Sequence, residues 1–117
     1  QWEAAAGAFK RAVVLSRGNP KLIMAYAKAM ILGADGQVSD DAKKSLEMVM
    51  LQEPKNEEAR YYLAVQKLQD GHTQEAMKAM KELYRSLPED SPIKEMIDRQ
   101  IGKNEDSQAT AILDITR

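Results

Sequence analysis

His72 is the one histidine of this sequence, and histidine is the side chain best suited to proton transfer and metal binding near neutral pH. It lies in the turn Asp70-Gly71-His72-Thr73, and Glu75 follows three residues later. A metal site or a general base would require these groups to converge. A histidine beside two acidic residues is, however, a common chance arrangement in a polar turn. We therefore interpret His72 as an exposed turn residue.

The other residue types that carry chemistry give no catalytic pattern. The sequence has no cysteine, which excludes disulfides, thiolate metal sites and cysteine nucleophiles. No serine is spaced with a histidine and an acid as in a hydrolase, and no glycine-rich phosphate loop is present. The acidic pairs at 40–41, 57–58 and 89–90 fall where helices begin or turns occur, and capping and solubility explain them. We therefore expect no catalytic residue, no metal and no cofactor.

The composition also limits the kinds of partner. The 117 residues include 17 Lys and Arg and 18 Asp and Glu, so the net charge of -1 gives no reason to expect nucleic acid or an anionic membrane. Aromatic residues make up only 5%, which is low for a surface that stacks bases. No apolar run is long enough to span a membrane. Because the sequence opens at Gln1 without a signal peptide, we expect a fragment whose targeting or anchoring segment lies elsewhere.

A repeat organises the chain. Three similar boundary segments, at 16–19, 53–56 and 87–90, each separate two helical stretches. The unit from Glu57 to Asp90 spans 34 residues, which is the tetratricopeptide period. The unit from Pro20 to Asn56 spans 37 residues, and its three extra residues fit the turn between Gly33 and Asp41.

The helix-end signals agree with this period. Asn19-Pro20 and Ser91-Pro92 each offer an N-cap followed by a proline at the first helical position. Asn56, Ser39 and Thr73 are further N-cap candidates, and glycines at 18, 33, 36 and 71 suit helix C-termini. No segment reads as a strand. We expect helices near 3–16, 20–33, 40–52, 57–70, 73–86 and 92–102.

The fold class that follows is all-α, a tetratricopeptide-type superhelix of antiparallel helix pairs. Leu63-Ala64 gives the large-small pair of a first helix, and Pro88 closes the unit. The first 19 residues match only a second helix, so we expect half a repeat, two full repeats and a closing helix over residues 1–102. Residues 103–117 break the pattern. They could be a linker leading into the first strand of a following domain, a short packed helix or a frayed tail.

The repeat positions predict a binding surface. First-helix positions that face the inner side of such a superhelix carry mostly apolar residues, with two polar residues at the edges. They are Met24, Lys28, Ile31, Tyr61, Val65, Leu68 and Gln69. This strip suits an amphipathic helix or an extended apolar peptide. Alternatively, a missing upstream helix or the C-terminal tail covers it. Apart from Met24, we interpret most of the seven methionines as residues that fill the core.

Several runs resemble one family. PKLIMAYAKAM from Pro20 to Met30 and GADGQV from Gly33 to Val38 are similar to the c-type cytochrome biogenesis proteins of the CycH/CcmI kind. PKNEEARYYLA from Pro54 to Ala64 and LPEDSP from Leu87 to Pro92 fit the same family. The resemblance covers about two thirds of the chain.

The resemblance implies a specific role. The domain would sit in the periplasm, tethered by an upstream membrane segment, and would bind the C-terminal helix of an apocytochrome c. It would deliver that polypeptide to the haem-ligation machinery together with other maturation subunits, without touching haem itself. The alternative from the repeats alone is a generic scaffold joining subunits of another complex. Because the opening half repeat leaves a helix face uncovered, self-association into a homo-oligomer is a further expectation.

Overall fold

The computed structural model describes residues 4, 7–8, 10–11 and 18–103, and the described residues before 18 include helical ones. Four helices follow, α2 (Pro20–Gly33), α3 (Asp40–Gln52), α4 (Glu57–Gln69) and α5 (Thr73–Ser86). A closing helix occupies residues 92–103. The described residues contain no strand. The all-α prediction is confirmed, and α4 ends one residue earlier than expected. The alternatives for residues 103–117 lie almost wholly outside the described residues.

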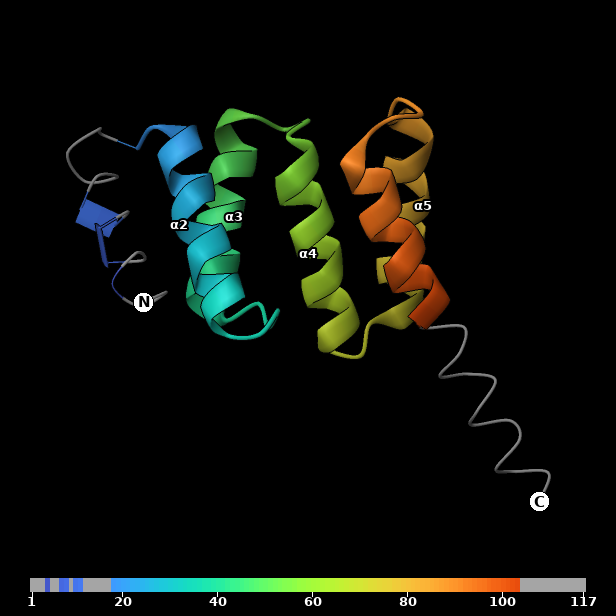
Figure 1. The fold of residues 1–117 in the computed structure, drawn as a ribbon, viewed down its shortest axis with the longest axis horizontal. Helices are drawn as coiled ribbons and strands as arrows, with labels where there is room; N and C mark the ends of the chain where they lie inside the picture. Colours follow the sequence, from blue (N-terminus) through green and yellow to red (C-terminus); the bar gives the residue numbers. More distant parts are fainter. Residues whose placement is uncertain (1–3, 5–6, 9, 12–17, 104–117) are drawn as a thin grey trace, which may run out of the picture.

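The helices form two layers of antiparallel pairs. α2 packs on α3, α4 packs on α5, and α3 also contacts α4, so the two hairpins stack side by side. Figure 1 shows α2, α4 and the closing helix in the front layer, with α3 and α5 behind them. First helices of successive hairpins therefore lie next to one another. This arrangement makes the core of each hairpin depend on its neighbour.

Side-chain caps fix four of the helix starts, including that of the closing helix, where the Ser91 Oγ accepts from the Ile93 amide at 3.2 Å. The Asn19 Oδ1 accepts from the Lys21 amide at 2.9 Å, and the Ser39 Oγ accepts from the Ala42 amide at 3.2 Å. The Asn56 Oδ1 accepts from the Ala59 amide at 2.9 Å. These bonds satisfy amides that would otherwise lack a partner in the first turn, and they confirm the predicted caps at Asn19, Ser39, Asn56 and Ser91.

The predicted cap at Thr73 was wrong by one residue. α5 begins at Thr73, and the cap position belongs to His72, whose side chain makes no capping hydrogen bond. The turn before it is instead closed by Gly71, which has a φ of 87°. The chain reverses through this glycine, and the His72 amide donates to the Lys67 carbonyl at 2.9 Å. The backbone conformation at Gly71, and not the predicted Thr73 side-chain cap, therefore shapes the turn before α5.

Two groups of buried side chains form the core. The first lies mainly between α2 and α3 and comprises Ile23, Met24, Ala27, Ile31, Ala42, Leu46, Val49 and Ala59. The second lies between α4, α5 and the closing helix and comprises Tyr61, Ala64, Val65, Met80, Leu83, Leu87, Ile93 and Ile97. We call them the first and second core clusters. Helix α4 contributes to both, because Ala59 faces the first and Tyr61, Ala64 and Val65 face the second.

The first core cluster generates a stability prediction within one helix. Leu46→Ala should lower the free energy of unfolding by about 2–5 kcal/mol, because Leu46 is 0% exposed and its removal leaves a cavity. Leu51→Ala is the matched control on α3, and its 84% exposure predicts a change within about 0.5 kcal/mol. Urea unfolding followed by circular dichroism measures both. Equal effects of the two substitutions would contradict the placement of this core.

Candidate functional site

The structure buries most of the predicted apolar strip. Met24 and Ile31 belong to the first core cluster, and Tyr61 and Val65 belong to the second. All four side chains are at most 6% exposed. The prediction that they form an open strip was therefore wrong. Of the five apolar residues in that set, only Leu68 is half-buried rather than buried.

Neighbouring helices explain this burial. Tyr61 and Val65 pack in the same cluster as Ile93 and Ile97, which belong to the closing helix. Tyr61 also interacts with Gln100 of that helix, and burial raises the pKa of the Tyr61 phenol while this hydrogen bond opposes the increase. The self-covered alternative thus describes Tyr61 and Val65 better, although the covering element is the closing helix itself.

Gln69, which we predicted at the polar edge of a groove, instead holds the turn between α2 and α3. Its Oε1 accepts from the Val38 amide at 2.9 Å, and its Nε2 donates to the Gly36 carbonyl at 2.9 Å. Both ends of the amide therefore hold the turn that carries the three extra residues between α2 and α3. In that turn, Asp35 and Gly36 have positive φ values of 53° and 91°. The sequence shows the insertion, but the partners of its backbone groups lie 31 and 33 residues away in sequence, on Gln69.

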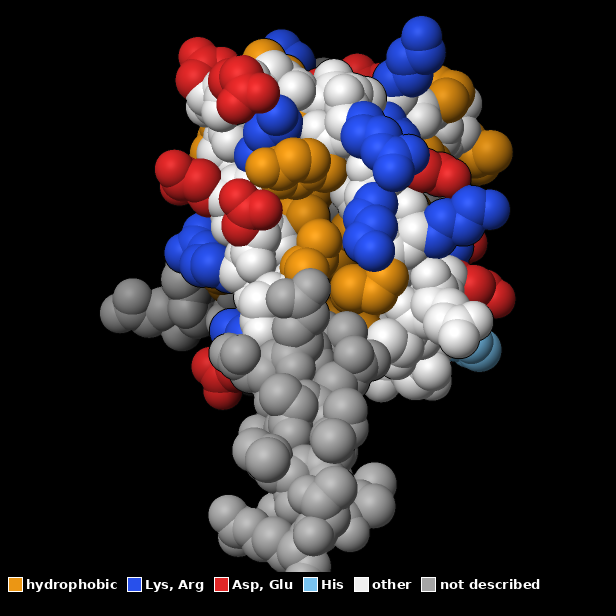
Figure 2. All heavy atoms as spheres, turned by 90° about the vertical axis from the view of Figure 1, so that its right-hand side faces the viewer, with side chains coloured by type: hydrophobic (Ala, Val, Ile, Leu, Met, Phe, Trp, Pro, Cys, Tyr) orange, Lys and Arg blue, Asp and Glu red, His pale blue; other side chains and the backbone are white. Residues whose placement is uncertain are grey.

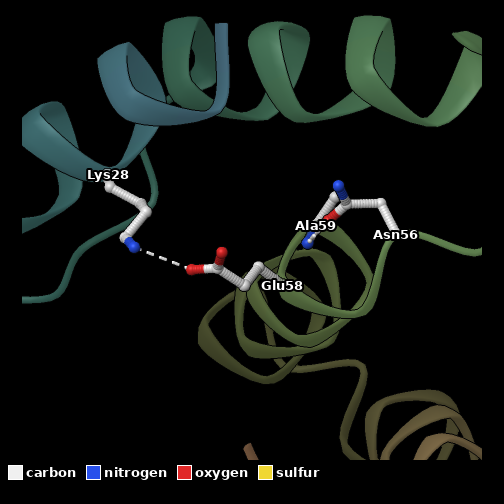
Figure 3. Close-up of polar contacts among 4 residues, drawn as sticks. All are labelled: Lys28, Asn56, Glu58 and Ala59. Atoms are coloured by element: carbon white, nitrogen blue, oxygen red, sulfur yellow. Dashed lines mark hydrogen bonds and ion pairs between the residues drawn. The ribbon is translucent and has the colours of Figure 1, made fainter. Parts of the chain in front are cut away.

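Lys28 does lie on the open face, but it is paired. Its Nζ is 2.8 Å from the Glu58 Oε2, and the two side chains are 41% and 44% exposed. Figure 3 shows this pair reaching across from α2 to α4. The hydrogen bond to Glu58 raises the pKa of Lys28 above its ordinary value. Ion pairs at this exposure contribute only about 0–1 kcal/mol, so a ligand charge can replace either partner.

Two shallow hollows meet beside this ion pair. The first is lined by Pro20, Lys21, Met24, Ala25, Lys28, Glu53, Asn56 and Glu58. The second is lined by Lys55, Asn56, Glu57, Glu58, Ser91, Pro92, Ile93 and Met96. They share Asn56 and Glu58, so together they form one surface along the first turns of α2, α4 and the closing helix. We call this surface the first-turn trough.

The trough has a fixed centre and apolar ends. Asn56 accepts from the Ala59 amide and donates through Nδ2 to Glu53 at 3.0 Å, so its side chain is held in place. Pro20 and the edge of Met24 lie at one end, and Met96 lies at the other. Alignment of Asn19-Pro20 with Ser91-Pro92 places Met96 at the position of Met24. That alignment was available in the sequence and would have added the closing helix to the predicted site.

The described residues hold no group of three or more His, Cys, Asp and Glu side chains placed to bind a metal ion. His72 is exposed at the start of α5, away from the residues of the trough. The expectations of no metal, no cofactor and no catalytic residue remain predictions. The chemistry that this geometry offers is recognition by a largely polar surface with a few apolar residues at its ends and one exchangeable ion pair.

Comparison with known proteins decides the family. The family model described as the cytochrome c-type biogenesis protein H TPR domain matches residues 1–94. This chain belongs to that family. The tetratricopeptide and cytochrome c biogenesis predictions are thereby confirmed. The matched range includes α2 to α5 and the residues of the trough except Met96, together with residues before 18.

A relative in the same family is much longer than this chain. The cytochrome c-type biogenesis protein CycH of Rhizobium meliloti (strain 1021) is 29% identical over 99 residues, which are 85% of this chain and 26% of that protein. The chain therefore spans about a quarter of that relative. No solved structure matches the chain. Within the described residues, no helix combines the length and apolar content that a membrane crossing requires.

The role of Gln69 generates a prediction about local order. Gln69→Ala should destabilise the fold by about 1 kcal/mol, because two hydrogen bonds to the turn between α2 and α3 are lost. It should also accelerate hydrogen exchange of the Val38 amide, which NMR measures residue by residue. Gln74→Ala is the control, since Gln74 is exposed on α5. Unchanged exchange at Val38 would show that the Gln69 contact is not made in solution.

Proposed function

We propose that this domain holds a polypeptide in the first-turn trough, and that the polypeptide is the C-terminal helix of an apocytochrome c awaiting haem attachment. The observation that carries the proposal is the trough itself, where two hollows with apolar ends meet at the Lys28–Glu58 pair. Membership of the cytochrome c-type biogenesis family supports the choice of client.

The trough suits an amphipathic helix better than a small molecule. It is shallow and long, and it crosses the first turns of three helices, as a helix-in-groove surface does. Met96 supplies an adaptable thioether contact at one end, and Pro20 supplies apolar surface at the other, where Met24 is only 6% exposed. Between them, Lys28 and Glu58 offer one charge of each sign, so a ligand helix with a basic or an acidic residue at its middle can replace one partner of the pair.

The cellular setting belongs to the same proposal. We place the domain at the periplasmic face of the membrane, where it works with other cytochrome maturation subunits and receives its tether from outside this sequence. The support is the family and the relative, a cytochrome c-type biogenesis protein. The binding step needs only the residues described above and can be tested apart from this setting.

The test is a binding titration with a synthetic peptide of an apocytochrome c C-terminal helix. Met96→Glu should weaken binding at least about tenfold, because it places a carboxylate where the trough offers apolar surface beside Glu57 and Glu58. Met48→Glu is the matched control, since Met48 is 47% exposed on α3 in the opposite layer. The control should bind as the unaltered chain does.

Two outcomes would contradict the proposal. One is that the unaltered chain binds the peptide no better than it binds a control peptide with the same residues in scrambled order. The other is equal weakening by Met96→Glu and Met48→Glu, which would place the peptide elsewhere. Substitutions at Tyr61 or Val65 do not serve here, because both side chains are buried and their loss would unfold the second core cluster.

A further inference from the structure

The end of the stack formed by α5 and the closing helix carries a second exposed apolar surface. Met77 and Tyr84 of α5 and Ile101 of the closing helix pack on the second core cluster but are only half-buried. Figure 2 looks at this end of the molecule and shows hydrophobic side chains running down its middle. We call it the end face. It lies on the far side of the closing helix from the trough.

One side of the end face is basic. Lys78, Lys81 and Arg85 are exposed on α5 and recur at spacings of three and four residues, so they share one side of the helix. Figure 2 shows Lys and Arg side chains along the α5 side of the apolar strip. Among the described residues, none of these three cations forms an ion pair.

The closing helix brings acidic residues to the other side. Lys94 lies over the Tyr84 ring at 4.6 Å, so its helix face adjoins α5. Asp98 is four residues later and therefore shares that face, while Arg99 acts on Tyr61 at the opposite side of the helix. Glu95 is exposed one turn before Asp98 and Arg99. Figure 2 shows Asp and Glu side chains on this side of the strip, with Lys and Arg side chains among them.

We infer that the end face is a self-complementary interface that binds a second copy of this chain. A two-fold axis lying in the interface parallel to the helices places α5 of one copy against the closing helix of the other. Lys81 and Arg85 of each copy then face Glu95 and Asp98 of its partner, and the apolar strips cover one another. An isologous contact of this kind repeats each charge pair twice.

The opposite charges on the two sides of the apolar strip also favour a second copy of this chain as the partner. A two-fold axis perpendicular to the helices would instead set α5 antiparallel to α5 and place three cations against three cations, which is repulsive. The axis parallel to the helices avoids that repulsion and extends the helix stacking beyond the closing helix. The trough remains free in such a dimer, so the inference is independent of the proposed client and its failure would leave that proposal intact.

The test is sedimentation velocity of the 117-residue chain from about 10 µM to about 1 mM, at low and at high salt. We expect a monomer–dimer equilibrium that weakens as salt rises. Lys81→Glu with Arg85→Glu should raise the dimer dissociation constant at least about tenfold, and so should Glu95→Lys with Asp98→Lys. All four side chains are exposed, so circular dichroism should show unchanged helix content.

Mixing the two double variants is the decisive step. Each alone carries like charges on both sides of its end face, whereas the mixture restores opposite charges across a heterodimer. Recovery of dimer in the mixture supports the two-fold interface. Three results would overturn it. The chain could stay monomeric at every concentration, both charge reversals could leave the dimer dissociation constant unchanged, or the mixture could fail to form dimer.

Discussion

The structure depends on helix α4 packing into two cores at once. Ala59 reaches the first core cluster, and Ala64 lies in the second beside Tyr61 and Val65. Small side chains allow this close approach, because a larger residue at either alanine would push one hairpin away. The hairpins therefore cannot separate without exposing apolar surface on α4, and each of them is stabilised by the other.

The trough follows from that constraint. Once α4 is fixed between its neighbours, the first turns of α2, α4 and the closing helix lie along one edge, and the side chains beside those turns form a continuous surface. Polar contacts then fix the ends of the helices. Asn56 caps α4, and Gln69 holds the longer turn between α2 and α3. What remains adjustable at the surface is the ion pair of Lys28 and Glu58, which makes it the point where a ligand can compete.

Much of the fold could be predicted from the sequence because caps and period are local signals. Pro20, Asn56 and Ser39 mark helix starts wherever the helices later pack. The inner strip could not be predicted in the same way, since exposure depends on the helix that packs alongside. Tyr61 and Val65 occupy positions that face a groove in a longer superhelix, but the closing helix covers them here. Gln69 was misassigned for a similar reason, because its partners are 33 and 31 residues away.

Backbone NMR of the chain, titrated with an apocytochrome c C-terminal peptide, would show whether a client polypeptide lies in the first-turn trough. With the peptide in the trough, we expect chemical shifts to change along one edge, at Lys28, Glu58 and Met96, while the amides around Met48 and Leu51 on α3 stay unchanged. Shift changes centred on α3, or spread evenly over both layers, would contradict this placement of the peptide.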